Sequence, residues 1–432
     1  MTADQWSINL VGFLVAAALL FLVTRLGRGW VPHAYLFSIL WALNLSVAQA
    51  ALSGKLRPDP ETLLVLFAAW WLYLLGTLGV LTGGRRQAGN FGRIPEIRPL
   101  PAVSLVLALV ALQWLSIGYE VSRRQLQSFF YGLLLPTLEL RLMGVLREED
   151  LPWFLEAWRW SYVWYIPLGL VLWRKGLVSK PFIALVFASA LLSSLTKLTR
   201  TPLLHVSTTA LVSWLLLWRP QPARVLLACF SLALAMWLFL VLSQTALTLS
   251  DPLARVTPAE SLLSYIGASV KAYEELIRGA LPREPGFYSL DALNFVLHKL
   301  SIIPSYPDIV RPAILAPIPM NTYTFLDVYT LDFGIAGALV GSFFTGALAS
   351  WLHQRVRKEA TLHNLVAYSY AAYAAIMAPM NNEFIRFSFI FSIGIGWTCH
   401  NLIVLRGRSP FARTKTRSCV LTSSPEGGPG QR

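Results

Sequence analysis

Residues 6–26, WSINLVGFLVAAALLFLVTRL, decide the fold class. A helix that crosses the hydrocarbon core of a bilayer needs about 20 mostly apolar residues, and the one charged residue of this stretch, Arg25, stands near its end. Ten later stretches are similar, so we expect an all-α integral membrane protein, a multi-pass helical bundle of about 11 (10–12) transmembrane helices. The expected helices are 6–26, 31–52, 62–82, 100–119, 157–173, 181–197, 201–218, 225–247, 333–354, 363–380 and 385–405.

The composition of the whole chain supports this class. Only 13% of its 432 residues are charged and 55% are hydrophobic, whereas a soluble domain has roughly 25% charged residues. The net charge is +14, and the basic residues lie in short loops between apolar stretches. This distribution favours the positive-inside pattern over binding to nucleic acid. Asp4 and no basic residue precedes the first apolar stretch, so we expect a retained first helix and no cleaved signal peptide.

Lys and Arg residues in short loops set the expected orientation. With the N-terminus outside, the cytoplasmic loops and the C-terminal end hold twenty of them, and the short outer loops hold five. Those five are Lys55, Arg57, Lys197, Arg200 and Arg386. The sequence therefore predicts an outer N-terminus and a cytoplasmic C-terminus.

Four parts follow one another along the chain. We expect transmembrane helices 1–8 in residues 1–247, a large outer loop in 248–331, helices 9–11 in 332–405 and a disordered basic tail in 406–432. The large loop contains nine prolines, and because long loops without secondary structure are uncommon, we expect short helices over the outer mouth of the bundle. Residues 125–146 are a candidate interfacial or re-entrant helix.

Two basic residues, Lys197 and Arg200, end the expected sixth helix on its outer side. They are three residues apart and share a face if that turn is helical, and Pro202 predicts a break of the helix at Thr201. Both are candidates to bind an anionic headgroup such as a pyrophosphate, because a guanidinium makes bidentate, charge-assisted contacts. The alternative is that they only extend into lipid headgroups.

The expected eleventh helix begins at a polar stretch, Asn381 to Arg386. Glu383 and Arg386 are three apart, and Arg386 lies slightly inside the apolar run. An unpaired charge there costs about 2.5–3.5 kcal/mol on insertion scales, so we expect a partner or a wet cavity. Asn382 and Arg386 are candidate substrate-binding residues and Glu383 a candidate catalytic one; a salt bridge that closes the helix end is the alternative.

A polar and aromatic stretch ends the large loop and enters the expected ninth helix. Asp332 falls at the expected N-terminus of that helix, where capping explains it, and Gly337 and Gly341 form a small-xxx-small pair typical of close helix packing. Aromatic rings and carboxylates that line a wet cleft would also suit the binding of a sugar chain, because rings stack on sugar faces and carboxylates accept hydrogen bonds from hydroxyl groups. The candidate site residues of the stretch are Asn321, Tyr323, Thr324, Asp327 and Asp332.

No metal or cofactor is expected. The three cysteines, Cys229, Cys399 and Cys419, have no metal-ligand spacing. The chain also lacks a zincin motif, a P-loop, a dinucleotide fingerprint and a nucleophile elbow.

Two motifs resemble a known family. The run NTYTFLDVYTLDFGIAGALVGSFFTG, from Asn321 to Gly346, resembles the signature of the O-antigen polymerase group, the Wzy-type oligosaccharide repeat-unit polymerases. In that group a segment of the form Asn-x-Tyr-Thr, an aromatic and acidic stretch and Asp-Phe-Gly-x-x-Gly enter a late transmembrane helix. The run LTRTPLL, from Leu198 to Leu204, is similar to an arginine-containing motif of the same proteins.

The resemblance implies a fold related to GT-C glycosyltransferases, located in the bacterial inner membrane. It implies an undecaprenyl-pyrophosphate-linked oligosaccharide as substrate, a chain-length regulator protein as a candidate partner, and transfer of the growing glycan onto the next lipid-linked unit. Our hypothesis is that Arg200, with Lys197 or Arg255, binds the pyrophosphate. Asp327, Asp332 or Glu383 then activates or orients the acceptor hydroxyl, and the sequence does not choose among them.

Three other functions remain open at this stage. A flippase or transporter of lipid-linked sugars usually shows internal repeats and charges near the bilayer midplane, whereas the charges of this chain gather at one face. An O-antigen ligase uses the same donor with a different acceptor. A structural membrane scaffold is the third alternative.

Overall fold

The computed structural model describes most of the apolar stretches and parts of the loops. The described residues are 3–26, 31–50, 58–83, 94–123, 158–195, 200–218, 221, 224, 258–279, 288–304, 314–315, 319–320 and 323–404. Some of the predictions concern residues outside these ranges. They are the predictions for 125–146, 225–247 and 406–432, and for Lys197, Arg255 and Asn321.

The described part is helical apart from one antiparallel pair of two-residue strands, β1 (Ile314–Leu315) and β2 (Pro319–Met320). Ten of the eleven expected stretches coincide with helices, and two further helices, α12 and α13, lie in the large loop. The helices are α1 (Ala3–Leu26), α2 (Pro32–Ala50), α3 (Pro60–Gly83), α4 (Pro99–Arg123), α8 (Tyr162–Arg174), α9 (Lys180–Leu195), α10 (Arg200–Trp218), α12 (Pro258–Ile277), α13 (Asp291–Lys299), α14 (Asp327–Lys358), α15 (Leu362–Met377) and α16 (Phe387–Ile403).

Several helices are suited to a lipid environment. Among the described residues, four stretches are long and apolar enough to cross a membrane, namely Ser7–Leu26, Pro60–Gly83, Pro99–Tyr119 and Asp327–Lys358. The shorter helices at Lys180–Ser194, Pro202–Trp218 and Ser388–Ile403 are also apolar. Large apolar side chains such as Leu10, Leu14 and Phe21 of α1 are exposed, as expected for side chains that face lipid. The chain is therefore a membrane protein whose described part is almost entirely helical.

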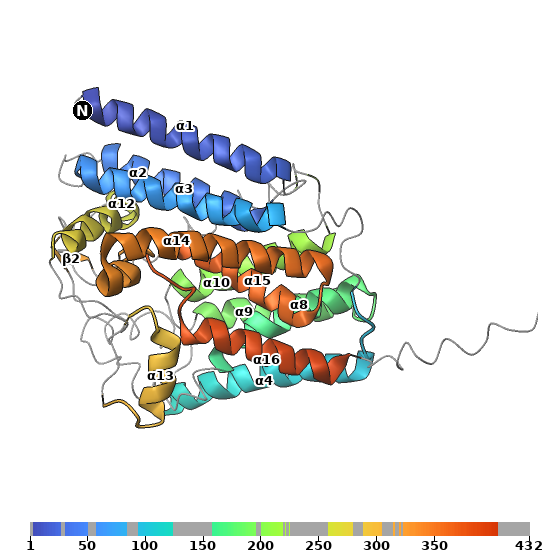
Figure 1. Cartoon of the computed structure of the whole chain (residues 1–432). Helices are drawn as coiled ribbons and strands as arrows, with labels where there is room; N and C mark the ends of the chain where they lie inside the picture. Colours follow the sequence, from blue (N-terminus) through green and yellow to red (C-terminus); the bar gives the residue numbers. More distant parts are fainter. Residues whose placement is uncertain are drawn as a thin grey trace, which may run out of the picture.

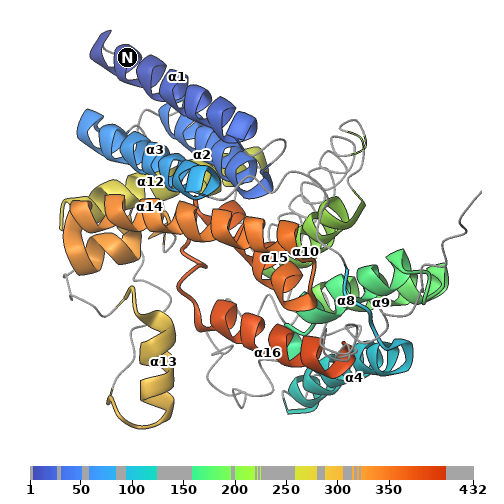
Figure 2. The same ribbon diagram turned by 45° about the vertical axis from the view of Figure 1, so that its right-hand side comes forward.

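The helices form a bundle around α15. One side of the bundle contains α1, α2 and α3, the opposite side contains α4 and α16, and α14 and α15 run between them (Figures 1 and 2). Fourteen of the 16 residues of α15 are buried, and it contacts α2, α8, α10, α14 and α16. A helix that is buried all round belongs in the core of a large bundle.

The closest helix pair joins α3 to α14. A Cβ atom on Gly76 would collide with the backbone oxygen of Phe343, and one on Gly346 with that of Tyr73. Between the two helices, Ser342 Oγ donates a hydrogen bond to the carbonyl oxygen of Ala69 at 2.9 Å. Small residues with interhelical hydrogen bonds are the usual means of close packing between helices in membranes.

Helix α14 is broken at Gly334, so its long part begins close to the expected residue 333, and a short helical part that starts at Asp327 precedes the break. Gly334 has φ +70° and ψ −165°, a conformation open to glycine because it lacks a Cβ atom. The break turns the short part before it back along the long part after it, so that Tyr329 packs against Gly341 and its hydroxyl lies 3.2 Å from Thr345 Oγ1. The short part of α14 therefore packs against the long part at Gly337 and Gly341. Side chains at these two positions would leave no room for it.

Two other helix ends differ from the expectation. Helix α10 begins at Arg200, so the predicted break at Thr201 was wrong, and Pro202 lies within the first turn. Proline is tolerated there because the first N–H groups of a helix have no intrahelical acceptor. Arg386 precedes α16 as its N-cap residue with extended backbone, so it does not lie inside the helix.

The fit of Tyr329 against Gly341 predicts opposite effects for two glycine substitutions. Gly341→Ala should lower the free energy of unfolding by about 1–3 kcal/mol, because the new methyl group displaces the buried ring. Gly394→Ala is the matched control in α16, where a Cβ atom meets nothing within 4 Å, and it should be neutral or slightly stabilising. Unfolding in detergent, followed by intrinsic fluorescence, measures both, and equal effects would contradict the back-folded arrangement.

Candidate functional site

Three segments that the sequence singled out meet at one end of the bundle. Phe325 N–H, just before α14, donates a hydrogen bond to the carbonyl oxygen of Ala378 at 2.8 Å, which joins the start of α14 to the end of α15. His205, in the second turn of α10, stacks on Tyr373 of α15 with ring centroids 4.0 Å apart. The start of α10, which is Arg200, therefore lies at the same end as the start of α14 and the turn between α15 and α16.

Glu383 and Arg386 face each other in the turn between α15 and α16. Arg386 Nε lies 4.0 Å from Glu383 Oε1, and Asn381 Nδ2 donates a hydrogen bond to the same oxygen at 3.1 Å. Glu383 is buried and Arg386 is partly buried. The expected partner of Arg386 is therefore present.

The environment of Glu383 favours its protonated form. Burial raises the pKa of the Glu383 carboxyl above its ordinary value, Arg386 opposes the rise, and the negative charge of Asp291 on α13 adds to it. A buried carboxyl group with a raised pKa, beside an arginine, is a candidate for proton transfer.

Aromatic side chains form the wall beneath Glu383. The Tyr370 hydroxyl lies 2.6 Å from Ser388 Oγ, and the Tyr162 hydroxyl lies 3.4 Å from His205 Nδ1. The other ring nitrogen of His205, Nε2, is buried and has no hydrogen-bond partner among the described residues. A buried polar atom without a partner costs about 1–3 kcal/mol, so this nitrogen marks a position where a water molecule or a substrate group would be stabilised.

Asp332 does not cap the helix in which it lies. Its two carboxylate oxygens accept hydrogen bonds from the backbone N–H groups of Tyr288 at 3.0 Å and Ser289 at 2.6 Å. These groups lie just before α13, so Asp332 ties that helix to α14. These contacts with the segment before α13 were not predicted from the sequence.

Asp327, Tyr323 and Thr324 are buried at the start of α14. Asp327 faces α12, where burial raises the pKa of the Tyr273 hydroxyl and the negative charge of Asp327 adds to the rise. Thr324 Oγ1 has no hydrogen-bond partner within the described chain. The three candidate carboxylates therefore lie in three different environments, and Glu383 is the one beside a candidate cation.

Asn382 has a structural task. Its side-chain nitrogen donates a hydrogen bond to the carbonyl oxygen of Phe325 at 2.9 Å, and its Oδ1 accepts one from Phe384 N–H at 3.1 Å. These contacts hold the turn between α15 and α16 against the start of α14.

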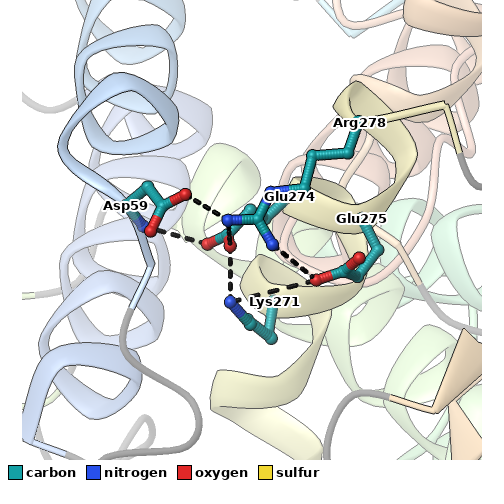
Figure 3. A network of polar contacts seen from close by, with 5 residues as sticks. All are labelled: Asp59, Lys271, Glu274, Glu275 and Arg278. Carbon is teal, nitrogen blue, oxygen red and sulfur yellow. Dashed lines mark hydrogen bonds and ion pairs between the residues drawn. The ribbon is translucent and has the colours of Figure 1, made fainter.

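The charges of α12 form a separate network (Figure 3). Glu274 is buried, and its carboxylate accepts hydrogen bonds from Lys271 Nζ at 2.5 Å and from Asp59 N–H at 2.9 Å. Arg278 pairs with Glu274 at 2.8 Å, with Glu275 at 3.0 Å and with Asp59. The network fastens α12 to the start of α3, and its cations already have carboxylate partners.

A second buried polar cluster escaped the sequence predictions. The His33 ring lies 5.9 Å from the His353 ring, and His33 Nδ1 is 3.1 Å from the Tyr368 hydroxyl. His33 Nε2, His353 Nδ1 and the Tyr73 hydroxyl lack partners in the described part of the chain. Histidines inside apolar stretches were the available signal, and the cluster lies toward the C-terminal end of α14, away from the site.

Comparison with known proteins leaves the family open. No family model, curated protein or solved structure matches the chain. Across the described ranges, no group of three or more His, Cys, Asp or Glu side chains is arranged to hold a metal ion.

The contacts of Asp332 predict the effect of removing one of its acceptor oxygens. Asp332→Asn should release one of the two backbone N–H groups, and deuterium uptake of residues 288–299 should rise several-fold because α13 opens more often. Glu383→Gln, which leaves both hydrogen bonds in place, is the control and should not change the uptake. Equal protection of α13 in Asp332→Asn and the unsubstituted protein would contradict the anchoring role.

Proposed function

We propose that the chain is a membrane glycosyltransferase that polymerises undecaprenyl-pyrophosphate-linked oligosaccharide repeat units on the periplasmic face of the bacterial inner membrane. The product is a surface or secreted polysaccharide. The proposal includes about eleven membrane spans in a GT-C-like arrangement, a periplasmic N-terminus and a cytoplasmic C-terminus. It rests on the motifs at Asn321–Gly346 and Leu198–Leu204 together with the geometry at one end of the bundle.

The observation that supports the proposal most is the pairing of Glu383 with Arg386 at the end of the bundle where α10 begins with Arg200. The reaction needs a cation at the pyrophosphate and a base at the acceptor hydroxyl. Both kinds of group are present there, beside a wall of tyrosine rings and His205.

The proposed chemistry is a single displacement at the anomeric carbon. Glu383 in its carboxylate form takes the proton of the acceptor hydroxyl, and the hydroxyl oxygen forms the new glycosidic bond. The bond between the anomeric carbon and the pyrophosphate oxygen breaks, and the pyrophosphate leaves with the bonding electron pair. Arg200 and Arg386 stabilise the negative charge that develops on it, and Glu383 later returns its proton to water.

Glu383 is the preferred base among the three candidate carboxylates. The oxygens of Asp332 accept hydrogen bonds from two backbone N–H groups, and Asp327 faces α12. Glu383 also accepts a hydrogen bond, from Asn381 Nδ2, but it lies beside Arg386 and burial raises its pKa. Asn382 supports the site by holding its backbone, and the candidates for substrate contacts are Tyr323, Thr324, Lys197, Arg255 and Asn321.

Glycan banding of a deletion strain complemented with variants tests the function. Arg200→Ala should abolish long chains while a single repeat unit is retained, because loss of one charge-stabilising group slows transfer by about 10²-fold or more. Arg278→Ala removes an arginine that already pairs with carboxylates and should leave the chain length unchanged.

The alternatives give different bands in the same experiment. Loss of all attached units, including the single one, would indicate a ligase or a flippase. A normal ladder with Arg200→Ala would remove Arg200 from the mechanism.

The charges around Glu383 predict a pH dependence of transfer in a reconstituted assay. Activity should fall as the pH drops through the raised pKa of Glu383, because the protonated carboxyl cannot accept a proton. Asp291→Asn removes a neighbouring negative charge, lowers that pKa and should move the acid limb to lower pH. Arg386→Gln should move it to higher pH in the residual activity, and an acid limb that neither substitution shifts would exclude Glu383 as the base.

A further inference from the structure

Helix α13 buries the polar residues of its first turns and exposes several of its apolar ones. Asp291 and Asn294 are only 7% and 8% exposed, whereas Leu290, Leu293 and Leu300 are 49%, 51% and 64% exposed. A helix on a water-facing surface has the opposite pattern, with its apolar stripe toward the core. The inversion indicates that the outer face of α13 is in contact with something apolar.

The exposed stripe is continuous. Leu290, Leu293, Val296 and Leu300 recur at the spacing of one helix face, and Ile302, just beyond the helix, is also exposed. Contiguous apolar surface of this kind on a soluble face is unusual and marks an interaction site.

The direction of α13 identifies the partner. The helix runs across the direction of α14 and α16 in both views and lies at the end of the bundle where α14 begins (Figures 1 and 2). If α14 and α16 run along the membrane normal, α13 runs along the membrane plane. Helices that lie in the plane of the bilayer surface have an apolar face in the acyl-chain boundary and cations at the headgroups.

One end of α13 has the side chains expected at a headgroup layer. Lys299, in its last turn, is exposed, and its Nζ lies 5.6 Å from the centroid of the Phe295 ring. A lysine stem that runs along apolar surface can keep its ammonium group at the level of lipid phosphates.

We propose that α13 is an interfacial helix whose apolar stripe, Leu290, Leu293, Val296 and Leu300, inserts into the lipid leaflet at this end of the bundle. The opposite face of the helix presents Asp291 toward Glu383, and Asp332 holds the segment before it. Lipid contact thereby fixes the helix that closes one side of the Glu383 and Arg386 pair. This inference does not depend on the reaction proposed above.

Site-directed fluorescence in nanodiscs tests the insertion. A cysteine at Leu293, in a background with Cys229, Cys399 and Cys419 replaced, is labelled with an environment-sensitive fluorophore, and the protein is embedded in phosphatidylcholine with or without nitroxide groups on the acyl chains. The matched control is a cysteine at Glu61, which is exposed at the start of α3. We expect nitroxide lipid to quench the label at Leu293 several-fold more than the label at Glu61, and aqueous iodide to show the reverse order.

Two outcomes would overturn the proposal. Strong quenching by iodide and none by nitroxide lipid would place α13 in water, and quenching by neither would show that protein covers the stripe, from this chain or a second copy. A measurement that retains the native cysteines compares deuterium uptake of residues 288–302 in nanodiscs. Leu293→Glu should raise the uptake several-fold and Leu293→Ala much less, and equal uptake in both variants would also contradict insertion.

Discussion

The break in α14 at Gly334 positions the other groups at this end of the bundle. A continuous helix would carry Asp327 and Asp332 straight away from the bundle, because each residue advances an α-helix by about 1.5 Å. The positive φ of Gly334 reverses the chain instead, and Gly341 leaves the space that the Tyr329 ring occupies. Asp332 then reaches the backbone before α13, and Phe325 reaches the end of α15.

Most of the buried polar groups discussed at this end have structural contacts, and Glu383 is the candidate for a chemical role. Asn382 and Asp332 hold backbone N–H and carbonyl groups, and Glu274 neutralises the cations of α12. Glu383 is different because burial and Asp291 both disfavour its charge. A buried carboxyl group whose charged form is disfavoured and which lies beside a cation is a candidate for proton transfer. This environment distinguishes Glu383 from the other carboxylates.

The two proposals describe the same end of the molecule at two scales. In the proposed glycosyl transfer, Glu383 and Arg386 are the reacting and charge-stabilising groups. Helix α13 lies beside this pair, with an apolar outer face and with Asp291 on its inner face. A lipid-linked substrate has one part in the bilayer and one part in water. A site bounded by an interfacial helix meets both parts, because such a helix lies at the boundary between them.

The sequence by itself determined the class of fold and most helix positions. Apolar length decides where helices form in lipid, and stretches such as 6–26 and 62–82 coincide with α1 and α3. It also located Glu383, Arg386, Asp327 and Asp332 as unusual residues. It placed the start of α10 within one residue and the start of the long part of α14 beside Gly334, but it did not predict the short helical part before that break.

Only the tertiary structure decided what these residues do. Contacts between segments far apart in the chain decide three features. They determine the backbone groups that donate to Asp332, the ring that fills the space at Gly341 and the charge that faces Glu383. His205 and His33 lie inside apolar stretches, and nothing local distinguishes a histidine that packs against lipid from one that faces other buried polar groups. Apolar patterning is a local property that sequence records, whereas the pairing of polar atoms is a property of the packed bundle.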